Sequence, residues 1–171
     1  MDKAEFKIRK ARENDISSIM KIYAHARTFM AEHGNPNQWG PNNWPPESLI
    51  AEDIEQGRCY LCILDERTVG VFYFTKGLKV DPAYDVIYDG SWQGDDTYGV
   101  VHRIASDHSV KGVGSFCVKW AFDQCGNIRM DTHPDNRVMQ NMLEKLGFQY
   151  CGIIYVQQDT APRLAYEKYI K

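Results

Sequence analysis

The sequence lacks an apolar stretch long enough to cross a bilayer, and its first residues, MDKAEFKIRKA, lack the apolar centre of a signal peptide. It also lacks an excess of basic over acidic side chains. Its 20 basic and 23 acidic side chains give a formal net charge of -3, which provides no broad positive field for a nucleic-acid backbone. From these absences we expect a cytoplasmic protein whose partners include neither a membrane nor a nucleic acid.

Cysteines are few and odd in number: Cys59, Cys62, Cys117, Cys125 and Cys151. Because most of them lie in apolar segments, we expect reduced core thiols and not a disulfide framework. The first two have the spacing of a zinc knuckle, but a strand pattern surrounds them and no second pair completes a site. We therefore expect no bound metal.

What the sequence does contain is the composition of a soluble globular protein, with 43% hydrophobic, 12% aromatic and 25% charged residues. A length of 171 residues is enough to bury a core without disulfides. No internal repeat or low-complexity tract interrupts the chain. We expect a single domain over residues 1–171.

Apolar periodicity and turn residues predict alternating strands and helices. The expected strands are residues 6–11, 59–65, 68–75, 98–106, 127–133, 148–155 and 164–168, and the expected helices are 16–30, 47–56, 115–125 and 136–146. The two strands after residue 59 form a hairpin across Glu66-Arg67. The order β-α-α-β-β-β-α-β-α-β-β predicts a mixed sheet flanked by helices, of the α/β (α+β) class.

Two long connections contain residues that a plain surface loop does not need. His33 to Pro46, HGNPNQWGPNNWPP, is rich in Gly, Pro and Asn and holds Trp39 and Trp44, so we expect it to form a wall of a pocket. Lys76 to Thr97 is long, irregular and rich in Tyr, Asp and Gly. Loops of that length inside a compact domain are often functional.

The stretch SDHSVKGVGSFCVKW, from Ser106 to Trp120, places glycines between an apolar strand and a predicted helix. The first backbone amides of a helix are unpaired and carry partial positive charge, and glycine lets an anion approach them closely. Gly112-Val113-Gly114 lacks the Gly-Lys-Ser/Thr ending of a nucleoside-triphosphate loop. The tripeptide alone is equally compatible with a tight turn that binds nothing.

The ordered series HRIAS, KGVGS and MDTHPDNRVMQNMLEKLGF resembles the GNAT superfamily of N-acetyltransferases, and the predicted element order fits that fold across nearly the whole chain. The resemblance implies the acyl-CoA N-acyltransferase fold, a mostly antiparallel sheet with a splayed central strand pair. It also implies acetyl-CoA as cosubstrate. By carry-over, Lys111, Gly112, Val113, Gly114 and Ser115 form the pyrophosphate turn, Ile104, Ala105 and Ser106 line the pantetheine arm, and Asn136 reaches the coenzyme.

Two positions depart from the family pattern. Ser109 stands where the family usually has Arg or Gln, three residues before the first turn glycine, so the pyrophosphate loses a side-chain donor. Lys111 offsets that loss as a point charge or is simply solvated. Leu143 stands where many relatives carry a tyrosine that protonates the leaving thiolate.

Acetyl transfer to an amine requires a base, because a free lysine-type amine has a pKa of about 10.4. The first candidate is His102 on the coenzyme-binding strand; the alternative is a hydrogen-bonded structural histidine. His133 and Asp131 face the acceptor or else orient the next loop and helix. Glu32 and Glu144 are expected to be solvated. The proton donor is open: Tyr155, Tyr84, Tyr88 and Tyr98 are candidates, and we expect water to share the proton transfer.

The two divergent loops are expected to select the acceptor. Their tryptophans and four carboxylates suit a small cationic amine, although a solvated acidic loop with two buried tryptophans is the alternative; the carboxylates are Asp85, Asp89, Asp95 and Asp96. We therefore expect an N-acetyltransferase that modifies a primary amine of a small molecule or peptide by direct attack. The alternatives are a catalytically weak CoA-binding regulatory module, and an interaction domain that forms a homodimer through its last strands.

Overall fold

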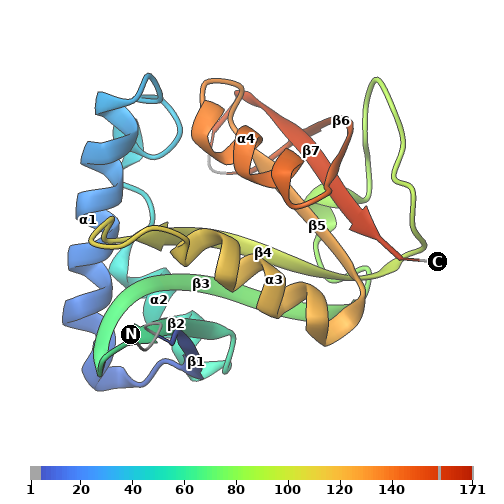
Figure 1. Ribbon diagram of the computed structural model, residues 1–171. Helices are drawn as coiled ribbons and strands as arrows, with labels where there is room; N and C mark the ends of the chain where they lie inside the picture. Colours follow the sequence, from blue (N-terminus) through green and yellow to red (C-terminus); the bar gives the residue numbers. More distant parts are fainter. Residues whose placement is uncertain (1–4, 158, 171) are drawn as a thin grey trace.

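The structure is a computed structural model that describes residues 5–157 and 159–170. Its centre is a seven-stranded sheet in the order β1-β2-β3-β4-β5-β7-β6 (Figure 1). The strands are β1 (Lys7–Lys10), β2 (Cys59–Leu64), β3 (Arg67–Leu78), β4 (Thr97–Ser106), β5 (Asn127–Thr132), β6 (Gln149–Tyr155) and β7 (Pro162–Tyr169). Every strand pair is antiparallel except β4 with β5, so the predicted mixed sheet and fold class are confirmed.

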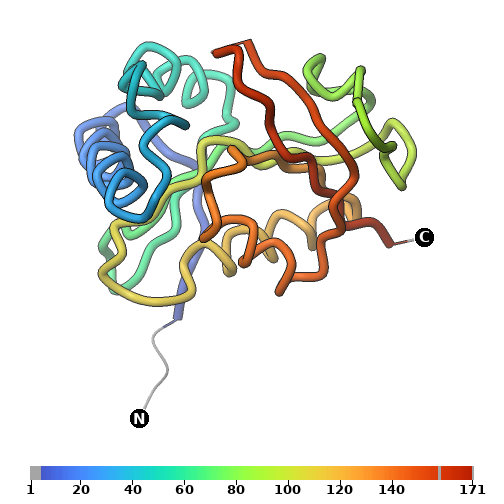
Figure 2. The backbone as a smooth tube through the Cα atoms, turned by 90° about the horizontal axis from the view of Figure 1, so that it is seen from above, coloured from blue at the N-terminus to red at the C-terminus, as the bar shows by residue number. Residues whose placement is uncertain are grey.

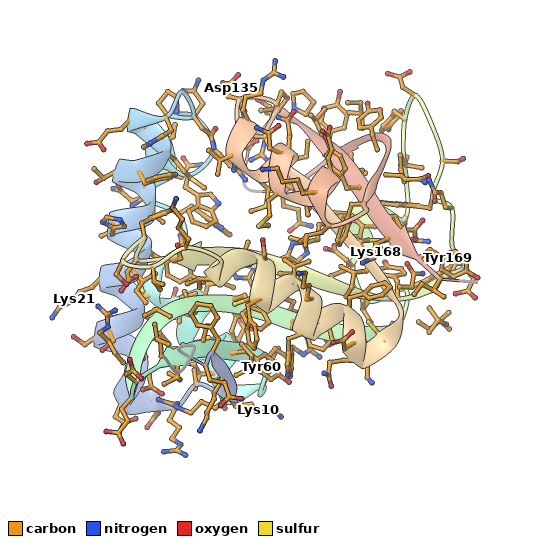
Figure 3. All side chains as sticks on the ribbon, viewed as in Figure 1. Lys10, Lys21, Tyr60, Asp135, Lys168 and Tyr169 are labelled. Atoms are coloured by element: carbon orange, nitrogen blue, oxygen red, sulfur yellow. The ribbon has the colours of Figure 1, made fainter. Side chains whose placement is uncertain are left out.

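Four helices cover the two faces of the sheet: α1 (Ile16–Glu32), α2 (Glu47–Glu55), α3 (Val113–Cys125) and α4 (Arg137–Lys145). Helices α3 and α4 share one core cluster with residues such as Phe72 and Met130, whereas α1 and α2 share another with Leu61 and Val71. Side chains fill the space between the layers; Tyr60 of β2, for example, packs against Trp120 with ring centroids 5.1 Å apart (Figure 3). Because successive side chains along a strand point to opposite faces of the sheet, the helices on the two faces pack against different residues of the same strands.

The central strands β4 and β5 separate soon after they meet. They pair only at Gly99 with Ile128 and at Val100 with Arg129, and beyond that point each continues without the other. A register shift between β3 and β4 bends β4 at Arg103, which has a φ of 50°. Two contacts of Arg103 fix the bend. The Tyr23 hydroxyl donates to the Arg103 carbonyl at 2.6 Å, and the Arg103 guanidinium pairs with Asp53. The opening between the two strands is where a ligand can enter the sheet.

The connection from residue 79 to residue 96 is held against the far end of the sheet, beside the C-terminal strands (Figure 2). The buried pair of Arg129 and Glu167, 2.8 Å apart, supplies the anchor. Glu167 accepts hydrogen bonds from the amides of Gln93 and Gly94, and Arg129 donates to the carbonyls of Gly94 and Asp95. The loop that the sequence predicts to be irregular is therefore ordered by an ion pair beneath it.

The structure moves several predicted boundaries. The hairpin turns at Asp65-Glu66, with φ values of 49° and 65°, and not at Glu66-Arg67, because the twist of the strands favours a turn with two left-handed residues. Strand β3 runs to Leu78, since its end pairs with the start of β4. Strand β7 lies between β5 and β6, and Tyr88 pairs with Ile153 on the outer edge of β6.

The cysteines do not form a metal knuckle. Cys59 belongs to the core cluster under α1, and Cys62 belongs to the cluster under α3, so their side chains point to opposite faces of β2. All five cysteines are free thiols, and four of them are buried, as predicted. Within residues 5–157 and 159–170, no group of three or more His, Cys, Asp or Glu is placed to hold a metal ion. In the same part of the chain, no helix is long and apolar enough to span a membrane.

Candidate active site

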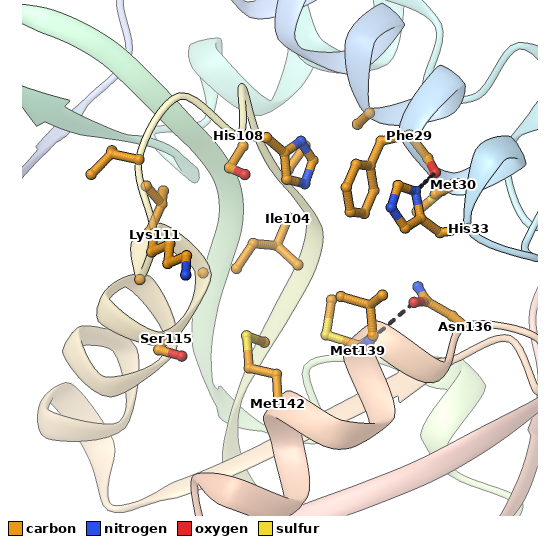
Figure 4. A pocket seen from close by; sticks show the side chains of 18 of the residues that line it. Phe29, Met30, His33, Ile104, His108, Lys111, Ser115, Asn136, Met139 and Met142 are labelled. Atoms are coloured by element: carbon orange, nitrogen blue, oxygen red, sulfur yellow. Dashed lines mark hydrogen bonds between the residues drawn. The ribbon is translucent and has the colours of Figure 1, made fainter.

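Two cavities of similar size meet where β4 and β5 separate. The first, about 540 Å³, lies between the C-terminal half of α1, the loop from β4 to α3 and the start of α4 (Figure 4). The second, about 520 Å³, lies between the 33–46 loop, β4, β5 and β6. Both are lined by Met30, Ile104, Asn136 and Met139. A molecule that fills the first cavity can therefore present one end to the second.

The first cavity brings together all nine residues that the resemblance assigns to the coenzyme: Ile104, Ala105, Ser106, Lys111, Gly112, Val113, Gly114, Ser115 and Asn136. Among the residues that the structure describes, none of those lining this cavity is acidic, although the whole chain carries a formal net charge of -3. Its ionisable members are Lys111, His33 and His108, all of which are basic. This part of the surface is suited to an anion.

The glycine turn is shaped for close approach. Gly112 has a φ of 90° and serves as the N-cap of α3, a conformation that costs glycine little. The first hydrogen bond of the helix runs from the Phe116 amide to the Gly112 carbonyl at 3.0 Å, so the amides of residues 113–115 have no partner within the helix. A Cβ on Gly114 would lie 3.0 Å from the Met142 sulfur, which faces it from α4. A side chain at Gly114 would press against α4, so this glycine lets the turn and α4 approach each other closely.

The two departures from the family pattern have structural consequences. Ser109 is occupied within its own turn: its hydroxyl donates to the Asp107 carboxylate at 2.6 Å and accepts from Arg67 at 3.0 Å. Leu143 is fully buried in the core under α4 and does not line either cavity. Neither residue offers a free donor to a coenzyme, so both roles must be taken by other groups.

The second cavity holds His102 between two carboxylates. Its Nε2 lies 2.5 Å from Asp81 Oδ2, and its Nδ1 lies 3.8 Å from Asp131 Oδ2. Burial alone would raise the pKa of Asp81, but the hydrogen bond and charge of His102, with the Ala83 amide, outweigh it and lower that pKa below its ordinary value. A neutral His102 that donates Nε2–H to Asp81 has the Nδ1 lone pair free. That nitrogen can accept a proton from a bound amine.

The tyrosine candidates differ in their surroundings. Tyr84 is buried, and its hydroxyl donates to Asp131 at 2.6 Å; burial first, and then the nearby Asp131 and Asp81 charges, raise its pKa well above the usual value. The Tyr98 hydroxyl contacts the backbone of Asp81 at 3.3 Å. Tyr155 lines the second cavity with half of its surface exposed. Tyr84 thus contacts the Asp131 carboxylate and Tyr98 the backbone of Asp81, and Tyr155 is the candidate that lines a cavity.

Other predicted candidates lie apart from the cavities. His133 lines neither of them, and its Nδ1 accepts a hydrogen bond from the Asp135 amide at 3.0 Å. Burial and the nearby Arg163 charge lower its pKa. Glu32 and Glu144 are exposed, as predicted.

The residues of the two long loops differ in whether they line a cavity. Trp39, Trp44 and Gln38 line the second cavity and Asn35 lines the first, which confirms that the 33–46 loop forms a pocket wall. The four carboxylates expected to face the acceptor, Asp85, Asp89, Asp95 and Asp96, line neither cavity. All four are exposed, so of the two readings that the sequence left open the structure shows the solvated acidic loop; Glu167 and Arg129 draw its 93–96 segment toward β5 and β7. The acidic side chains at the second cavity are Asp81 and Asp131.

Sequence reasoning missed a chain of side-chain amides across the junction. Asn136 Oδ1 accepts from the Met139 amide, so its Nδ2 donates to Gln38 Oε1, which also accepts from Asn35 Nδ2; each distance is 3.0 Å. The backbone N–H of Met139 can only donate, and this fixes the orientation of all three amides. The chain links α4 to the 33–46 loop. A cap signal at Asn136 was readable, but nothing in the sequence pairs it with Gln38.

Comparison with solved structures identifies the family. The structure of a GNAT-family acetyltransferase from Streptococcus agalactiae has 32% sequence identity and a TM-score of 0.82, and the match covers 97% of this chain and 96% of that one. The chain therefore belongs to the GNAT family of acetyltransferases. A scan against models of known families finds no match, and a search of curated proteins finds none.

More distant structures support the fold alone. A GNAT-family acetyltransferase from Listeria monocytogenes has 19% identity and a TM-score of 0.69, with 98% of this chain and 96% of that chain covered. The ribosomal-protein-S18-alanine N-acetyltransferase from Escherichia coli has 12% identity and a TM-score of 0.62, with the same coverage. The acyltransferase class predicted from the glycine turn and the start of α4 is confirmed.

Proposed function

We propose that the protein transfers an acetyl group from acetyl-CoA to a primary amine of a small molecule or peptide by direct attack. The observation that carries this proposal is the meeting of two unlike cavities at the opening between β4 and β5. One has a glycine turn and no acidic side chain, and the other has a histidine between two carboxylates. Donor and acceptor would thus meet at Ile104 and Asn136.

The first cavity fits the coenzyme. The unpaired amides of residues 113–115 and the Lys111 side chain would hold the diphosphate, and the glycines leave the space for it. Ile104, Ala105 and Ser106 would lie along the pantetheine arm, where the separation from β5 leaves β4 without a neighbour on that side. Asn136 would contact the arm at the junction.

The second cavity supplies the base. His102 Nδ1 takes the proton that the amine nitrogen loses as it bonds to the acetyl carbon, and Asp81 stabilises the resulting imidazolium. Acetyl-CoA supplies the thioester, whose C–S bond breaks as the C–N bond forms. Backbone amides of β4 stabilise the charge that develops on the acetyl oxygen. The thiolate receives its proton from water or from Tyr155, which is the exposed tyrosine in this cavity.

The charge of the second cavity favours a cationic acceptor. Asp131, held by Tyr84, lies 3.8 Å from His102 Nδ1, and an ammonium group placed between them would be attracted to the carboxylate and aligned for deprotonation. Trp39 and Trp44 provide aromatic surface in the same cavity for the body of the acceptor.

Pairing of two copies through the last strands stays a prediction.

The test measures thiol release from acetyl-CoA in the presence of a panel of small amines and peptides, with an acid-quenched sample to identify the acetylated product. We expect thiol release that depends on the amine and yields an amide. Binding of acetyl-CoA without turnover on any amine would favour the regulatory module. If acetyl-CoA causes no thermal shift, the interaction domain would be favoured instead.

A further inference from the structure

Three histidines and Phe29 contact one another at one wall of the first cavity; His33 and His108 line that cavity, and His25 contacts His108 from α1. His25 and His33 lie on and just after α1, His108 lies in the loop after β4, and Phe29 lies between them. The Phe29 ring stacks on His33 at 3.8 Å and on His108 at 3.7 Å between centroids (Figure 4). His25 Nε2 lies 3.1 Å from His108 Nδ1. We call these four side chains the histidine row.

The groups that face the row are mostly basic. His33 and His108 line the cavity together with Lys111, and no acidic residue lines it. Asp107 precedes His108 in the chain; its carboxylate accepts from the Ser109 amide and hydroxyl and lies 4.0 Å from Arg67. Burial, followed by the charges of His25 and His33, lowers the pKa of His108, while Asp107 opposes the shift. The free row therefore lacks the counter-charge that would hold an added proton.

The row is nevertheless built to accept one proton. When His25 and His108 are both neutral, one of their two facing nitrogens donates and the other accepts. One added proton leaves this hydrogen bond in place and makes it charge-assisted. Both faces of Phe29 are covered by imidazole rings, and the face of an aromatic ring attracts a cation. The missing component is an anion.

We propose that the histidine row is a phosphate-binding wall of the coenzyme site, which takes up a proton when the phosphate groups of acetyl-CoA enter the first cavity. The proposal rests on the proposed function. The row thereby replaces the side-chain donor that Ser109, tied to Asp107 and Arg67, cannot supply.

The sign of the pH dependence follows. An anion raises the proton affinity of the row, so the coenzyme binds more tightly at low pH and more weakly as the pH rises through the interval between the free and bound pKa values. One proton allows at most about a tenfold change in Kd per pH unit.

The experiment measures the heat of binding at pH 7 in two buffers with different ionisation heats, which gives the number of protons taken up. The ligands are acetyl-CoA, its 3′-dephospho form, inorganic diphosphate and S-acetylpantetheine. The 3′-dephospho form removes the phosphate that itself titrates near pH 6. The variants are His108→Gln and His25→Gln, with His133→Gln as the control, because His133 lies outside both cavities.

We expect uptake of up to about one proton with acetyl-CoA, its dephospho form and diphosphate, and none with S-acetylpantetheine. Both row variants should lose the uptake and bind severalfold more weakly at unchanged melting temperature, and the control should retain it. Equal uptake by the row variants, or uptake with S-acetylpantetheine, would overturn the proposal. If acetyl-CoA binds without proton uptake, the proposal for the histidine row is wrong and the proposed function still stands. If acetyl-CoA does not bind at all, the proposed function itself is wrong.

Discussion

The two cavities are nearly equal in volume and share four lining residues, yet they are made in different ways. The first is built largely from one continuous stretch, Ile104 to Ser115, and backbone amides are central to its chemistry. The second is built from side chains that come from distant parts of the chain, such as Trp39, Asp81 and Asp131. Under the proposed function, this chain would hold the coenzyme largely on main-chain groups and the acceptor on side chains.

The strongest test of that division removes the base. His102→Gln should lower kcat about 10²- to 10⁴-fold, because the amide side chain of Gln cannot take the amine proton that the proposed mechanism transfers to His102. The Kd for acetyl-CoA should stay within about twofold, since His102 does not line the first cavity. Steady-state kinetics and calorimetry check the two quantities. An unchanged kcat would mean that the two cavities do not divide the chemistry in this way.

The converse test changes only the backbone side. Gly112 and Gly126 flank α3 with φ values of 90° and 70°, so alanine at either position should cost about 1 kcal/mol of stability. Only Gly112 lines the first cavity. Gly112→Ala should therefore weaken acetyl-CoA binding about tenfold, as expected for one impaired charge-assisted hydrogen bond, while Gly126→Ala leaves Kd unchanged. Equal Kd values in the two variants would contradict a role for the turn.

The amide chain at the junction should connect the two cavities. Asn136→Asp keeps the acceptor for the Met139 amide but loses the donor to Gln38, so the stability should change little while KM rises severalfold for both substrates. Asn136→Ser, which also caps the helix but cannot repel Gln38, serves as the matched control. A rise in only one KM would show that the cavities are independent.

The hydrogen bond between His102 and Asp81 should show itself in the pH dependence of stability. The pKa of Asp81 is lowered in the folded protein, so its stabilising contribution is present above the ordinary Asp pKa of about 3.9 and is lost as the pH falls through the folded value. Thermal melts should therefore place Asp81→Asn below the wild type near pH 6, with the gap closing below about pH 4. A gap that is constant with pH would exclude this pair as its cause.

The smallest effect concerns a hydroxyl that has no partner. Among the described residues, three buried side-chain atoms lack one: Asn35 Oδ1, Asn127 Oδ1 and Thr132 Oγ1. Thr132 lines the second cavity, and replacing its hydroxyl with a methyl group of the same shape should leave the stability unchanged or raise it by up to about 1 kcal/mol. Urea unfolding of Thr132→Val, with Thr132→Ser as the reference, measures this. A clear loss of stability would show that the hydroxyl has a structural partner.

The coenzyme side could be predicted from the family resemblance, because the motifs that carry the resemblance are local in the sequence. A strand, a glycine turn and a helix start occupy adjacent residues, and the cap at Asn136 is visible from its own helix. All nine assigned residues line one cavity for that reason. The histidine row was partly readable as well, since His25, Phe29 and His33 recur at intervals of four residues.

The acceptor side could not be predicted because its contacts are distant. Asp81 looks in sequence like the cap of a short turn, a role that it does fill toward the Ala83 amide, and no spacing rule joins it to His102. The sequence could not decide between an acceptor-facing and a solvated acidic loop, because the loop's partner, the buried pair of Arg129 and Glu167, forms only when β7 enters the sheet. The position of the acidic loop therefore depends on the strand order of the sheet, which composition alone does not predict.

That insertion of β7 has a consequence for synthesis on the ribosome. Glu167 follows Arg129 by 38 residues, so Arg129 remains without its counter-ion until almost all of the described chain has been translated. Strand β5 has β4 on one side for only two residue pairs, and its other neighbour arrives last. During synthesis, the turn at Gly112 should thus be able to form before β6 and β7 complete the sheet beside the second cavity.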